Sequence, residues 1–212
     1  MSALAATACG GATGAPPAAH VLGSDVTDGQ LTSAANVFKA YFGLQHAPCG
    51  QLSGTGDTGD AACNRFSLGA LIQFRVAEAY AADHDLVIAD EDLHKAIDAF
   101  ESQVGADTLA AQLAANGATH DDFTELVRLS LLENEVAKKL AEQQANGGTI
   151  SQQDQTDAFG AWVRQQDHAG QIDVNPSFGR FDPTTLQVVR ITSTDPSATT
   201  SAAPTAVASP SA

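Results

Sequence analysis

The residues best suited to chemistry are three cysteines, and their spacing sets one of them apart from a pair. Cys9 stands among small residues, whereas Cys49 and Cys63 flank a stretch rich in Gly, Asp, Ser and Thr. Neither member of the pair has a CxxC or histidine-spaced partner, so the pattern does not predict a zinc site. We expect a disulfide between Cys49 and Cys63, which indicates an oxidising, extracytoplasmic compartment. Closing a loop of about 15 residues contributes on the order of 3 kcal/mol in the chain-entropy model.

The stretch around Cys9 resembles the end of a bacterial lipoprotein signal. Residues 1–8 are small and apolar, and two glycines follow the cysteine. In such signals the cysteine receives lipid and becomes the mature N-terminus, so we expect lipidation at Cys9 and a signal remnant with a flexible tether over residues 1–17. A charged start and most of the apolar segment are missing. An Ala/Gly-rich tail with a chance cysteine is therefore the alternative.

A glycine pattern and the histidines offer weaker signs of chemistry. Residues 54–59 spell G-x-G-x-x-G, but no strand is predicted before them and no helix is predicted to begin at Gly59, so we interpret them as a solvated loop. His84 lies between two acids, and adjacent side chains rarely face one ion. No serine or cysteine stands in a known nucleophile motif. We expect no catalytic residue, no metal site and no cofactor, and hence no enzymatic activity.

The charge balance narrows the class of partner. The chain has 212 residues, with 10 Lys and Arg against 25 Asp and Glu, which gives a net charge of −15. Binding to nucleic acid needs clustered basic residues, and the sequence has no basic stretch, so we expect no nucleic-acid partner. A membrane-spanning helix needs about 18 consecutive apolar residues, and no such run occurs. A hydrophobic content of 43% is enough for one core.

Apolar periodicity predicts a helical domain followed by a tail. The longest helix is expected at residues 121–144, with Thr119 as its N-cap and apolar side chains over most of its circumference, so other elements must cover it from several sides. Asp90 is the expected cap of the third helix. Residues 192–212 are rich in Ser, Thr, Pro and Ala, which is typical of a disordered tail. The other expected elements are a strand at 19–23, helices at 27–42, 67–83, 90–104, 107–115 and 151–168, and a strand at 186–191.

This order of elements, together with three segments, carries a family resemblance. The segments are AHVLGSDVTDGQL at residues 19–31, NRFSLGALIQFRVAEAYAADHDLVIADEDLHKAIDAF at 64–100, and DVNPSFGRFDPTTLQV at 173–188, of which the last is the most specific. They resemble the SurA N-terminal-like chaperone domain, which is related to the peptide-binding parts of PrsA foldases and trigger factor. The resemblance is to its small actinobacterial lipoprotein form, and it covers residues 18–191.

The resemblance implies a fold, a role and a set of contact residues. The fold is mainly α, with about six helices and short N- and C-terminal strands paired with each other, the first strand with the last. The role is that of a lipid-anchored, extracytoplasmic chaperone for unfolded or newly exported polypeptides; a dedicated adaptor for one cell-envelope protein is the alternative. The junction QQANGGTIS is too short for the isomerase domain of larger members, so we expect no prolyl isomerase activity. The residues expected to bind peptide are Phe123, Leu126, Phe159, Trp162, Phe178 and Phe181.

Overall fold

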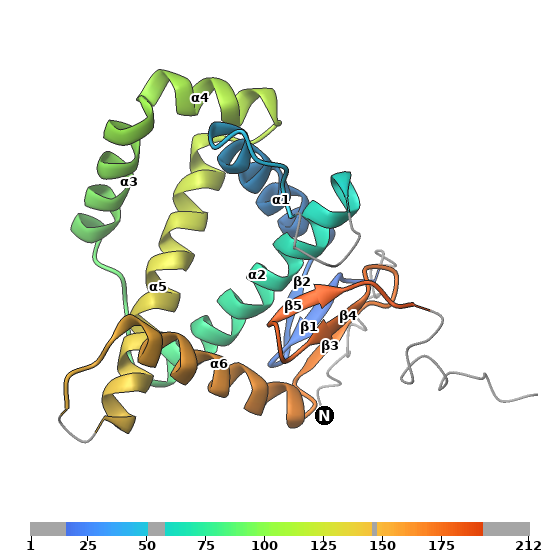
Figure 1. Cartoon of the computed structure of the whole chain (residues 1–212), viewed down its shortest axis with the longest axis vertical. Helices are drawn as coiled ribbons and strands as arrows, with labels where there is room; N and C mark the ends of the chain where they lie inside the picture. Colours follow the sequence, from blue (N-terminus) through green and yellow to red (C-terminus); the bar gives the residue numbers. More distant parts are fainter. Residues whose placement is uncertain (1–15, 51–57, 146–147, 193–212) are drawn as a thin grey trace, which may run out of the picture.

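A computed structural model describes residues 16–50, 58–145 and 148–192 and shows a mainly helical chain (Figure 1). The predicted fold class is thereby confirmed. The expected lipidation site at Cys9 and most of both tails lie outside the described residues. In the part that is described, no helix combines the length and apolarity needed to cross a bilayer. The elements are β1 (Ala19–Val21), β2 (Ser24–Val26), α1 (Asp28–Leu44), α2 (Gly59–Asp83), α3 (Asp90–Val104), α4 (Ala106–Ala115), α5 (His120–Gln144), α6 (Gln152–His168), β3 (Ile172–Val174), β4 (Arg180–Asp182) and β5 (Gln187–Val189).

Three helices begin at capping boxes. The side chains of Thr27, Thr119 and Ser151 each accept a hydrogen bond from the backbone three residues later, and the side chain of that later residue accepts one from the backbone of the cap. Each box satisfies two N–H groups that a helix start otherwise leaves unpaired. The prediction that Asp90 is the N-cap of α3 was wrong. Asp90 is the first residue of that helix, and Ala89 precedes it without a side-chain hydrogen bond.

The second helix is longer than the sequence predicted. It begins at Gly59 instead of Ser67, and its N-cap residue makes no side-chain hydrogen bond that could have marked the start. The added turns are held by tertiary contacts, because the ring of Phe66 meets those of Phe38 and Phe42 in α1 edge to face, at 5.0 and 5.4 Å between centroids. Contacts of this kind override a weak local signal.

The two ends of the domain meet in a three-stranded antiparallel sheet of order β2-β1-β3. In the central strand Ala19 stands opposite both Val26 and Val174. The predicted pairing of the N-terminal strand with a C-terminal strand is therefore present, with β3 as the partner. The sequence did not predict β2, which follows a reversal at Leu22 and Gly23. Both residues have positive φ, 52° and 78°, and a leucine rarely adopts that conformation.

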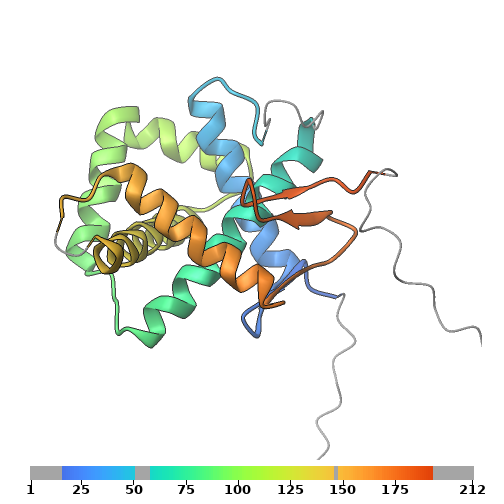
Figure 2. The same cartoon turned by 60° about the horizontal axis from the view of Figure 1, so that its bottom comes forward.

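The last strand lies elsewhere than expected. β5 pairs with β4 in a separate antiparallel hairpin, and not with the first strand. Gly179 has a φ of +136°, and a Cβ at this position would lie 2.2 Å from the carbonyl oxygen of Val189, so the hairpin closes only with glycine there. The hairpin packs on α2, where a Cβ on Gly69 would lie 2.9 Å from Oε1 of Gln187. Figure 2 shows the hairpin beside α6, on the side of the molecule away from α3.

Helix α5 contacts two hydrophobic clusters, and this explains its large apolar circumference. The main cluster lies among α1, α2, α5, α6 and the strands, and it includes Ile72, Val136 and Phe159. Leu126 of α5 packs against both clusters. The expected cover from several sides is thus provided by the other helices. The small cluster lies among α1, α3, α4 and the start of α5 and contains Val37, Ala40, Ile97, Leu109, Leu113, Ala118 and Phe123.

Candidate functional site

An apolar groove lies where the two hydrophobic clusters adjoin. Its volume is about 430 Å³, and its walls come from α1, α2, α3 and α5. Phe74 belongs to the main cluster and Phe123 to the small one, while Leu126 contacts both. The seam between the clusters is therefore not filled by the protein's own side chains. The lining residues are Val37, Phe38, Tyr41, Phe74, Ala96, Phe100, Phe123, Leu126, Val127, Ser130 and Leu131.

Aromatic rings connect three of the walls. The rings of Tyr41 and Phe100 stack with 6.1 Å between centroids, and Phe100 lies 5.3 Å from Phe123, so the contacts run from α1 through α3 to α5. Tyr41 is 38% exposed although its ring is largely apolar. Helix α3 fully buries only one side chain, Ile97, so it is the least firmly packed wall. Such rings offer a large contact area with few rotatable bonds.

A second hollow of about 320 Å³ continues the apolar groove and shares two of its lining residues, one on α2 and one on α5. We call it the polar end. Nη1 of Arg75 lies 2.6 Å from Glu78, and Nη2 of Arg128 lies 2.6 Å from Glu125 and 3.4 Å from Glu78. The pair between Arg128 and Glu78 bridges α2 and α5. Arg75, Glu78 and Glu125 of the polar end are therefore ion-paired, and the apolar lining is left as the main means of contact.

Asp122 joins α1 to α5 at the polar end. Its carboxylate accepts a hydrogen bond from the hydroxyl of Ser33 in α1, and it also closes the capping box with Thr119. Hydrogen bonds from Ser33 and Thr119 hold the pKa of Asp122 below its usual range. The ionised carboxylate thus fixes the wall formed by α1 relative to the one formed by α5.

The structure separates the six residues that the sequence predicted to bind peptide. Phe123 and Leu126 line the apolar groove. Phe159 and Phe181 are buried in the main cluster, with 4% and 8% of their surface exposed. The latter two contribute to the core, where aromatic side chains at helical or strand spacing are usually found.

The remaining two predicted residues also lie away from the groove. Trp162 packs against the main cluster, and Phe178 lines a different hollow near the N-terminus of α2. Conversely, sequence reasoning missed Tyr41, Phe74 and Phe100 as groove residues. Each was on or beside an apolar helical stripe, and such a stripe does not reveal which of its members meets a seam between clusters.

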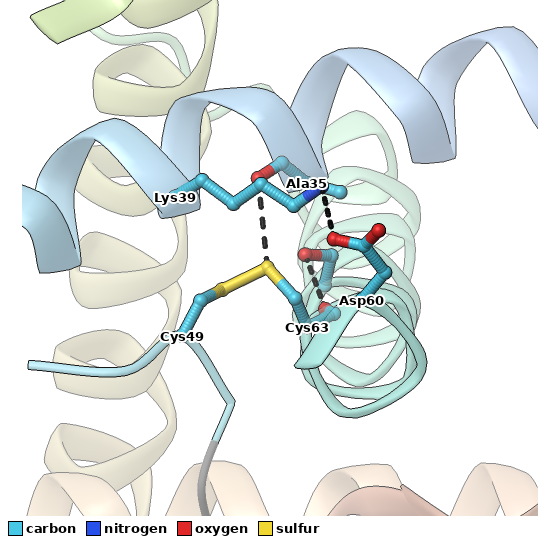
Figure 3. The surroundings of a disulfide bond; sticks show 6 residues. Ala35, Lys39, Cys49, Asp60 and Cys63 are labelled. Carbon is cyan, nitrogen blue, oxygen red and sulfur yellow. Dashed lines mark hydrogen bonds and ion pairs between the residues drawn. A yellow bond between two sulfur atoms is a disulfide. The ribbon is translucent and has the colours of Figure 1, made fainter. Parts of the chain in front are cut away.

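The predicted disulfide is present and lies between two walls of the groove. Cys49 and Cys63 are joined with 2.00 Å between the sulfur atoms (Figure 3). Because α2 begins early, Cys63 lies within that helix and not in a loop, and its sulfur is 3.6 Å from the carbonyl oxygen of Ala35 in α1. Nearby, Nζ of Lys39 pairs with Asp60 at 2.8 Å. The disulfide and the ion pair together hold α1 against α2.

The glycine pattern has one feature that the sequence did not predict. A helix does begin at Gly59, so that part of the argument against a dinucleotide-binding turn was wrong. Residues 47–50 are coil and turn and do not form the strand that such a turn requires, while residues 51–57 lie outside the described part. His84 stacks on Tyr80 with 3.9 Å between the ring centroids. Within the described residues, no three His, Cys, Asp or Glu side chains are placed to hold a metal ion.

Comparisons with family models, with curated proteins and with solved structures give no match to this chain.

Proposed function

We propose that this protein is an extracytoplasmic, chaperone-like lipoprotein that binds unfolded or newly exported polypeptides. The observation that carries the proposal is the apolar groove, which is open, lined by aromatic and aliphatic side chains, and continuous with the polar end. A groove of about 430 Å³ accommodates a few apolar side chains of an extended or helical segment. Its contacts are non-directional, which suits clients of varied sequence.

One feature of the structure supports the compartment in this proposal. A disulfide persists in oxidising compartments such as the cell envelope. Lipid attached to Cys9 would hold the domain at the outer face of the membrane, since two acyl chains suffice for stable anchoring. Replacing Cys9 with serine is expected to move the exported protein from the detergent phase to the aqueous phase in a partitioning assay. Equal partitioning of both forms would contradict the anchor.

Binding through the apolar groove can be tested with a fluorescently labelled, reduced and carboxymethylated protein that cannot fold. The double substitution Tyr41→Ser and Leu131→Ser removes apolar surface from the lining without emptying a fully buried site. We expect it to weaken binding in a polarisation assay about tenfold or more, because each lost apolar contact removes roughly 1 kcal/mol. Val87→Ser is the matched control, since Val87 is 86% exposed and is not a lining residue. Equal weakening by both variants would place client binding elsewhere.

The groove also permits the second function, a dedicated adaptor for one cell-envelope protein. The two functions differ in client range. A holdase suppresses aggregation of unrelated unfolded proteins in a light-scattering assay, whereas an adaptor leaves that aggregation unchanged at several-fold excess. We favour the holdase because the lining is built from aromatic and aliphatic side chains, while the charged groups at the polar end already have partners within the protein.

A further inference from the structure

A smaller pocket, separate from the apolar groove and the polar end, lies on the other side of α2. It is formed where α2, α5, α6 and the turn of the β4–β5 hairpin meet. Its volume is about 110 Å³. Apart from two aliphatic side chains and one phenyl ring, its lining is polar and comes from three helices. One carboxylate, four carboxamides and one hydroxyl face this small space. They belong to Glu133, Gln73, Asn134, Gln152, Gln155 and Thr156.

Glu133 is the unusual member of this set. Its side chain is partly buried, and this burial raises its pKa to about 7. Among the described residues, no hydrogen bond or ion pair is formed by its carboxylate. The two lysines on the same helix, Lys138 and Lys139, pair with Glu135 and Glu142 instead. A carboxylate in such surroundings is costly unless a partner neutralises it.

No charged residue of the neighbouring elements lines the pocket. Helix α2 contributes Gln73, and α6 contributes two glutamines, a threonine and a phenylalanine. Further along α6, Asp157 accepts a hydrogen bond from Gln153, and the guanidinium of Arg164 folds back over the preceding turn at Gly160. The hairpin contributes only Leu186. No residue of the lining therefore supplies a positive charge to Glu133.

We propose that the pocket around Glu133 binds a primary ammonium group, supplied either by a free small amine or by a lysine side chain of another polypeptide. An ammonium has three N–H donors, and the pocket provides one anionic and several amide oxygen acceptors. Calcium and magnesium sites commonly use several carboxylates, and this pocket has one. A volume of about 110 Å³ suits a compact head group on a short alkyl chain better than a planar guanidinium fork.

The proposal does not depend on peptide binding in the apolar groove, which lies on the opposite side of α2. It has a thermodynamic signature of its own, because ammonium binding favours the ionised carboxylate. A group that titrates near neutral pH must then release a proton when the amine binds. The release is expected to approach one proton per amine at roughly pH 6 and to approach zero at roughly pH 8. Affinity should rise over the same interval.

The experiment is a titration with butylammonium, followed by backbone amide chemical shifts of residues 133–137 and 152–156 and by calorimetry in buffers of different ionisation enthalpy. We expect saturable shifts at these residues and at least about tenfold weaker binding in Glu133→Gln. Glu135→Gln is the matched control, because Glu135 is on the same helix and its carboxylate is 3.7 Å from Lys138. Its affinity for butylammonium should equal that of the unsubstituted protein. Nα-acetyl-lysine amide, titrated in parallel, distinguishes a lysine side chain from a free amine as the better ligand.

Three outcomes would overturn the assignment. Butanol, which has the same alkyl chain without the charge, would show an apolar pocket if it bound equally well. Calcium would show a metal site if it caused the same shifts with the same dependence on Glu133. Unchanged butylammonium affinity in Glu133→Gln would show that the carboxylate takes no part in binding. Failure of any of these tests leaves client binding in the apolar groove unaffected, since that is measured with Tyr41 and Leu131.

Discussion

Glu133 gives the stability of the free protein a specific dependence on pH. Burial raises its pKa from the ordinary 4.5 to about 7, so the folded protein keeps the proton over an interval in which the unfolded chain has lost it. The free energy of unfolding should therefore fall as the pH rises from about 4.5 to about 7, by up to about 3 kcal/mol, and level off above that. Glu133→Gln should remove this loss and be the more stable form at about pH 8. Urea unfolding at about pH 5 and about pH 8 measures both effects, and parallel pH dependence in the two proteins would contradict them.

At the scale of residues, sequence reasoning succeeded where the partner is local. The cap at Thr119 needs only its own helix, so its spacing identified it. Cys49 and Cys63 were paired correctly because there was no other partner nearby in the sequence. Glu133 had no such signal. Most of its neighbours in the pocket come from other helices. The local sequence around Glu133 is typical of an acidic residue on a solvated helix surface.

At the scale of elements, the joint between α1 and α2 is the most strongly reinforced. The disulfide closes a segment with a sequence separation of 14, and replacing both Cys49 and Cys63 with serine should lower the free energy of unfolding by about 3 kcal/mol. The urea midpoint of the oxidised protein measures this change. Cys9→Ser is the control, because it changes a cysteine outside the bridge and should leave the midpoint unchanged. A double serine variant with an unchanged midpoint would show that the joint is held by packing alone.

The elements that sequence reasoning misplaced are those whose ends are set by contacts distant in sequence. The start of α2 depends on Phe66 packing against α1, and no capping signal marks it. The segment DVNPSFGRFDP was identified as distinctive, and its residues explain why. Asn175 accepts hydrogen bonds from the backbone and hydroxyl of Ser177, and Gly179 permits the close approach of the second hairpin strand. The motif thus encodes a turn at Asn175 and a close contact between two strands at Gly179. It does not indicate which strand makes that contact.

At the scale of the whole molecule, the two hydrophobic clusters divide the domain into parts of unequal strength. Helix α3 buries one residue, whereas α2 buries twelve, so α3 should open without global unfolding. Hydrogen exchange should give α3 amides an opening free energy at least about 2 kcal/mol below that of α2 amides. A bound client should slow exchange in α3, since that helix forms one wall of the apolar groove. Exchange of α3 and α2 at one common rate would show a single cooperative unit.

The architecture as a whole was predictable as a mainly helical domain closed by terminal strands, because helical periodicity is strong and isolated strands need partners. The groove was not, since it depends on how two clusters meet and not on any one helix. The apolar circumference of α5 indicated that several elements cover it. The apolar circumference did not indicate that Leu126 would contact both clusters or that a groove would remain between them.

The central position of β1 also sets the order in which the domain can be completed. β1 lies between β2 and β3, and Asn175 donates from Nδ2 to the carbonyl oxygen of Pro17 across a sequence separation of 158. A chain made from its N-terminus must therefore hold one edge of β1 unpaired until the residues of β3 emerge. All six described helices come out in that interval. Closure of the sheet is consequently a late step of high contact order. The unpaired edge of β1 stays exposed while the helices are being made.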